Sequence, residues 1–107
     1  MKNKHYNLIP VLDEQLIVVS DGVFEGEPVE GVRYFSPKHM SGWWITTEKF
    51  DGNIDNLRNE HYSHLIEKRP DLLKFMDLPF GFRFFQDGYK KHKEDVWFDE
   101  KIIEDEK

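Results

Sequence analysis

The sequence predicts an α+β domain: a mostly antiparallel sheet of four to five strands, with one long and one short helix packed on one face. Two observations predict it. Short runs of β-branched and aromatic residues, bounded by Gly, Pro and Asp turn signals, occur near both ends of the chain. Between them the apolar residues recur every three or four positions, which is typical of an amphipathic helix.

The first predicted strand, residues 16–20, is apolar on both faces, so we expect it in the middle of the sheet. Residues 23–31 contain two glycines and a proline and are predicted as a loop. The remaining strands are expected at residues 32–36, 43–47, 82–85 and 96–98.

The long helix is predicted over residues 54–68, with Ile54, Leu57, His61 and Leu65 on its apolar stripe. Pro70 ends this pattern and suits the first turn of a short second helix over residues 71–76. We find no repeat or linker and therefore expect one domain over residues 1–107, with 1–12 and 99–107 peripheral.

Composition excludes several classes of protein. The chain has no cysteine, which excludes disulfides, thiolate catalysis and cysteine-based zinc sites and suits a reducing cytoplasm. Its longest apolar run is far shorter than a membrane span, and no signal core follows the start, so we expect a cytoplasmic protein without a membrane partner.

No motif indicates an enzyme. His61 and His64 lie three residues apart, whereas zincin helices place two histidines four apart, and no third ligand is identifiable. Ser20-Asp21 lies in no nucleophile turn, and glycine spacing gives no phosphate loop. The sequence therefore predicts no catalytic residue, no metal and no cofactor.

A basic cluster at Lys90, Lys91 and Lys93 is the one candidate for nucleic-acid binding. Glu94 and Asp95 follow at once and offset its charge, so we predict no nucleic-acid partner.

The pair Trp43-Trp44 follows a Ser41-Gly42 bend. Alternation along a strand puts the two rings on opposite faces. We expect Trp43 in the core and Trp44 exposed as an interface anchor, with the reverse assignment left open.

A known pattern runs in order along residues 16–89: Val19-Ser20-Asp21, a tyrosine-bearing strand, Ser41-Gly42-Trp43, Asn59, Pro70-Asp71-Leu72 and Leu78-Pro79-Phe80-Gly81. On these residues the chain resembles immunity protein family 33 of bacterial polymorphic toxin systems, formerly a domain of unknown function. It departs from the family pattern at Met40, where an aspartate is common, and at Trp44-Ile45, where the family has Arg-Phe.

The resemblance implies a non-catalytic immunity protein that binds a cognate toxin and blocks it by occlusion. The net charge is −6, and no Lys or Arg lies between Asp13 and Glu30, which suits a basic toxin. The predicted partner-binding residues are Glu25, Glu27, Glu30 and Trp44. The alternative is a housekeeping protein-binding module or regulator of unknown partner, and the chain is expected to be a monomer or a homodimer.

Overall fold

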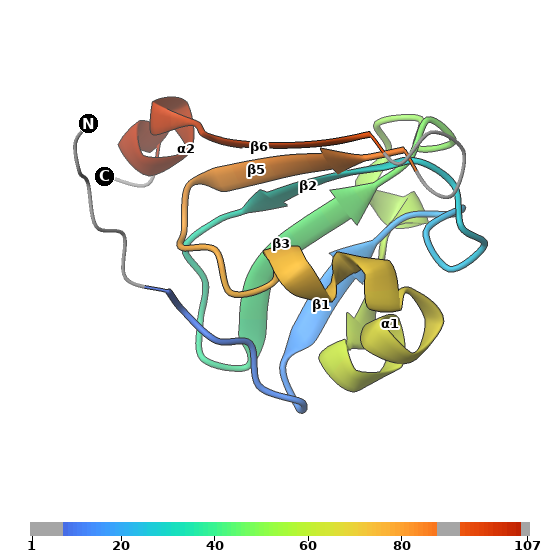
Figure 1. Ribbon diagram of the computed structural model, residues 1–107, viewed down its shortest axis with the longest axis horizontal. Coiled ribbons are helices and arrows are strands. Elements are labelled where there is room, and N and C mark those ends of the chain that lie inside the picture. Colours follow the sequence, from blue (N-terminus) through green and yellow to red (C-terminus); the bar gives the residue numbers. More distant parts are fainter. Residues whose placement is uncertain (1–7, 88–92, 106–107) are drawn as a thin grey trace.

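The computed structural model describes residues 8–87 and 93–105 of the chain. Within these residues a single sheet carries short helical segments (Figure 1). The elements, in chain order, are β1 Leu16–Val19, β2 Val29–Arg33, β3 Met40–Thr46, the 3-10 helix η1 Ile54–Asn56, β4 Arg58–His61, α1 Tyr62–Lys68, the 3-10 helix η2 Pro70–Phe75, β5 Phe82–Gln86, β6 Glu94–Phe98 and α2 Glu100–Asp105.

The α+β class is confirmed, but the sheet is larger and more mixed than predicted. Six strands lie in the order β4-β1-β3-β2-β5-β6. β1 pairs with β3 in parallel, and the other pairings are antiparallel. The chain passes from β1 to β2 and leaves a gap between these two strands. β3 then enters the gap, antiparallel to β2 and parallel to β1. β1 has a strand on each side, as its apolar sequence predicted.

The prediction of one long helix over residues 54–68 is wrong. Residues 58–61 form β4, which pairs antiparallel with β1 from Leu16↔His61 to Val19↔Arg58. The backbone groups along this side of β1 need partners, and β4 supplies them. Ile54, placed on the predicted apolar stripe, is 69% exposed. The helix α1 begins at Tyr62 and spans only two turns.

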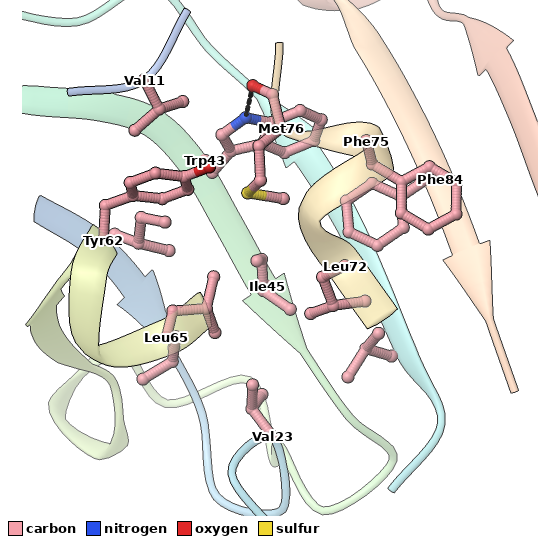
Figure 2. Close-up of a cluster of buried hydrophobic side chains, with 13 residues drawn as sticks. Val11, Val23, Trp43, Ile45, Tyr62, Leu65, Leu72, Phe75, Met76 and Phe84 are labelled. Atoms are coloured by element: carbon pink, nitrogen blue, oxygen red, sulfur yellow. Dashed lines mark hydrogen bonds between the residues drawn. The ribbon is translucent and has the colours of Figure 1, made fainter. Parts of the chain in front are cut away.

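The hydrophobic core lies between the sheet and the helical segments α1 and η2 (Figures 1 and 2). Aromatic rings occupy its centre: Phe84 stacks on Phe75 at 4.3 Å between centroids and meets Trp43 edge-on at 5.2 Å. Tyr62 and Leu65 reach this core from α1, and Leu72 and Met76 reach it from η2 and the turn that follows.

β2 starts three residues earlier than predicted, because Gly31 lies inside the strand rather than in a loop. A Cβ atom at Gly31 would lie 2.2 Å from Cε2 of Phe84. The glycine therefore lets the Phe84 ring lie directly against the β2 backbone. At the other end of the chain α2 follows β6, and its Ile102 is buried.

Candidate functional site

A bulge in β3 sets the direction in which the two neighbouring tryptophans point. Leu16 pairs with Met40 but Val18 pairs with Trp44, so β3 contains extra residues opposite β1. Gly42 takes a φ of 93°, a left-handed conformation that favours glycine. The Ser41-Gly42 bend predicted before the strand therefore lies within it.

Trp43 points into the core, as predicted. It is fully buried, and its Nε1 donates a hydrogen bond of 2.9 Å to the carbonyl of Met76 (Figure 2). The indole N–H therefore has a partner in the core, which a buried tryptophan needs.

Arg33 is the residue that sequence analysis missed. It is 1% exposed and lies on β2 directly opposite Trp43. Its Nε donates to the carbonyl of Ser41 at 2.8 Å, and its Nη1 donates to the carbonyls of Ile9, Met76 and Leu78 at 2.6, 3.0 and 2.8 Å. Burial lowers the pKa of Arg33 to about 10. Its position in an alternating β-strand was the only sequence signal that it could face the core.

Trp44 points to the opposite face of the sheet, where it is 36% exposed. The strand registers place one residue from every strand in a row across this face. The row runs from β4 to β6 through Asn59, Val18, Trp44, Val32, Arg83 and Trp97. We call this side of the sheet the open face.

A second row on the open face contains two carboxylates, Glu30 and Asp95. Thr46, Glu30, Phe85 and Asp95 lie side by side on β3, β2, β5 and β6. Glu30 and Phe85 also line a groove with Pro28, Thr46 and Glu48. On the other side of Trp44 a second groove is lined by Val18, Met40, Ile54, Leu57, Arg58 and Asn59.

The two arginines on and beside the open face, Arg58 and Arg83, are paired with carboxylates. Arg83 contacts Asp99 at 3.1 Å and Glu30 at 3.8 Å. Arg58 contacts Asp21 at 3.2 Å and Glu60 at 3.0 Å. Within the part of the chain that the structure describes, Glu48 and Asp95 have no such ion pair.

The residues predicted to bind a partner divide between two places. Glu30 and Trp44 share the open face. Glu25 and Glu27 lie in the loop between β1 and β2, where the Oε1 of Glu25 accepts a hydrogen bond from the N–H of Gly22 at 3.0 Å. The carbonyl of Glu27 accepts a hydrogen bond of 3.0 Å from the buried Arg69, which ties this loop to the segment between α1 and η2.

His61 and His64, the candidate metal ligands, do not converge. His61 is exposed at the end of β4, and Nδ1 of His64 lies 3.1 Å from Oε1 of Glu60. Residues 8–87 and 93–105 contain no group of three or more His, Asp or Glu side chains that could hold a metal ion. Lys90 and Lys91 of the basic cluster lie outside the described residues. No helix in the described ranges has the length and apolar character needed to cross a membrane.

Comparison with known proteins gives one match. A family model described as Imm33-like domain matches residues 1–99. No curated protein and no solved structure matches the chain.

Proposed function

Since the chain belongs to the Imm33-like domain family, we propose that it is an immunity protein that binds a toxin protein and neutralises it by occlusion, without catalysis. The partner is a protein, and the open face of the sheet is the surface that contacts it. Residues 1–99 match the family, so the match includes every strand of the sheet.

One observation supports the open face as the surface that binds the partner. The open face places an exposed tryptophan, Trp44, in the same sheet as the carboxylates of Glu30 and Asp95, with Glu48 at its rim. Tryptophan near the centre of an interface is a common binding hot spot, and interfaces are usually surrounded by a polar rim. Arg58 and Arg83 are already paired, whereas Glu48 and Asp95 have no ion pair among the described residues, so these two carboxylates remain for a partner.

That charge supports a basic partner. Opposite charges across an interface raise the rate of association and select the partner. A toxin that acts on nucleic acid has a basic substrate site, and the acidic rim would compete for that site in place of phosphates. Glu25 and Glu27, in the loop that leads into β2, are included in the proposed acidic surface because of their charge.

The experiment is co-expression of this chain with the protein encoded by the neighbouring reading frame. We expect the two to co-purify and the chain to restore growth of cells that produce the toxin. Trp44→Ala and the triple change Glu25→Lys, Glu27→Lys and Glu30→Lys should each weaken capture of the toxin.

Two controls lie on the opposite side of the molecule. Leu73, on η2, is 55% exposed, and Glu67, on α1, is also exposed. Leu73→Ala and Glu67→Lys should leave capture unchanged. If the triple lysine variant stays folded by circular dichroism and still captures the toxin with wild-type affinity, the acidic mechanism is wrong.

A further inference from the structure

β6 is an edge strand whose outward backbone groups can be identified. The N–H of Asp87 donates to the carbonyl of Lys93 at 3.1 Å, and the N–H of Asp99 donates to the carbonyl of Gly81 at 2.8 Å. In an antiparallel pair every second residue exchanges such bonds with the neighbouring strand. The N–H and C=O of Asp95 and Trp97 therefore face β5, and those of Val96 face outward.

This edge has only part of the protection that keeps edge strands from pairing: no proline or bulge interrupts it, although it is five residues long and carries Glu94 and Asp95. Proteins protect edges with prolines, bulges, charged side chains or very short strands. β6 pairs with β5 in an unbroken register from Phe82↔Phe98 to Gln86↔Glu94. Its Val96 and Trp97 are 47% and 41% exposed. β4, the opposite edge, is shorter and carries Arg58 and Glu60.

We propose that β6 pairs antiparallel with β6 of a second copy of this chain, about a two-fold axis at Val96. The two Val96 residues would then exchange N–H···O=C bonds across the axis. Such a contact is isologous, because the same strand serves on both sides.

The sequence of β6 is self-complementary in this register. Each acidic side chain lies opposite an aromatic one: Asp95 opposite Trp97 of the second copy, and Glu94 opposite Phe98 of the second copy. Lys93, just before the strand, lies opposite Asp99 of the second copy. Cross-strand neighbours of opposite charge stabilise a sheet, and like charges directly opposite destabilise it.

The neighbouring registers are worse. The two-fold axis can pass through a residue whose backbone groups face outward or, at a non-hydrogen-bonded pair, through one whose groups face β5. Axes at Glu94 and at Asp95 would each set two identical carboxylates directly opposite each other, and an axis at Trp97 would set Asp95 opposite Asp99, whereas the Val96 axis sets no like charges opposite each other. Only the Val96 axis pairs β6 along its whole length. The antiparallel pairing joins the two sheets with their open faces on the same side.

The measurement is sedimentation equilibrium of the purified chain. A contact made by one short strand is small, so we expect dimers to form between about 10 µM and about 1 mM. Val96→Pro removes the outward N–H but no hydrogen bond to β5, and edge positions of this kind tolerate proline. It should weaken dimerisation at least about tenfold.

Val96→Lys is the second variant, and it tests the proposed dimer if Val96→Pro does not fold. It keeps the backbone and sets two like charges at the axis, so it should also give monomers. Leu73→Lys adds the same charge on η2 and should dimerise as the wild type does. The proposal is overturned if the wild-type chain stays monomeric over this range, or if a folded Val96→Lys variant dimerises normally.

Discussion

Arg33 and Trp43 donate hydrogen bonds to the same acceptor, the carbonyl oxygen of Met76. The distances are 3.0 Å from Arg33 Nη1 and 2.9 Å from Trp43 Nε1. The two residues lie opposite each other on β2 and β3, and the guanidinium lies 5.8 Å from the centre of the indole ring. Together these two hydrogen bonds hold the end of η2 against β2 and β3 in the middle of the sheet.

Replacing Arg33 by methionine should destabilise the fold strongly. The carbonyls of Ser41, Ile9, Met76 and Leu78 all accept hydrogen bonds from Arg33, and buried carbonyls without partners are costly. We expect the free energy of unfolding to fall by about 3–5 kcal/mol, measured by urea denaturation. Arg58→Met is the control, because its exposed ion pairs should contribute about 1 kcal/mol or less. Equal losses in the two variants would contradict the anchoring role of Arg33.

Gly42→Ala should be far more costly than Gly52→Ala, although both glycines have a positive φ, of 93° and 86°. A Cβ atom at Gly42 would lie 2.2 Å from the carbonyl oxygen of Tyr34, whereas one at Gly52 would meet nothing within 4 Å. We expect the free energy of unfolding to fall by about 1–2 kcal/mol in Gly52→Ala, from its backbone conformation alone. In Gly42→Ala it should fall by about 3 kcal/mol or more. Thermal unfolding of the two variants measures the difference, and similar melting temperatures would argue against the bulge.

The same substitution should destabilise the fold much more at Trp43 than at the adjacent Trp44. Trp43→Phe leaves a cavity in the core and removes a donor to Met76, so the free energy of unfolding should fall by about 2–3 kcal/mol. Trp44→Phe changes a half-exposed ring and should cost less than about 1 kcal/mol. Chemical denaturation measures both values. A larger loss for Trp44→Phe would mean that the two faces are assigned the wrong way round.

The carboxyl group of Asp99 should titrate at low pH. Hydrogen bonding to Arg83, and then to the N–H of Lys101, lowers the pKa of Asp99 below its usual 3.8. A carboxylate with a lowered folded-state pKa adds stability that is complete above its unfolded pKa and is lost as the pH falls through the folded pKa. Carboxyl chemical shifts measured against pH should follow this titration.

Arg83→Met tests the cause of that shift. It should return the pKa of Asp99 toward 3.8. Asp51 is the internal control, because hydrogen bonds from Asn53 and Asn56, far from Arg83 in sequence, lower its pKa. An unchanged titration of Asp99 in the variant would show that the ion pair is not the cause.

Sequence pattern located most strands, because β-branched and aromatic runs are local features. It mistook β4 for the start of a helix, since Ile54, Leu57 and His61 happen to have helical spacing. Spacing records which residues could share a face, but not whether a neighbouring strand needs a partner. One side of β1 requires a pairing strand, and β4 pairs with it there.

The open face was partly predictable. Alternation along β3 put Trp43 and Trp44 on opposite faces, because side chains in a strand point to alternate sides. Which of the two rings is buried was left open by alternation, and the structure confirms the expected one, Trp43. The neighbours of Trp44 were not predictable, because Val32, Arg83 and Trp97 come from strands whose order in the sheet no local pattern records. Glu25 and Glu27 were chosen by charge. In the structure the Glu25 carboxylate accepts a hydrogen bond from Gly22 within the loop, and the backbone carbonyl of Glu27 accepts one from the distant Arg69, which charge alone did not suggest.

By itself the sequence determined the α+β class, the placement of Trp43 and Trp44 on opposite faces of a strand and the resemblance to an immunity-protein family, since these depend on residue type and local order. Tertiary structure alone decided the strand order, the burial of Arg33 among four carbonyls and the row of side chains across the open face. The physical reason is that these features join segments distant in the chain, and their hydrogen bonds form only after the strands have paired.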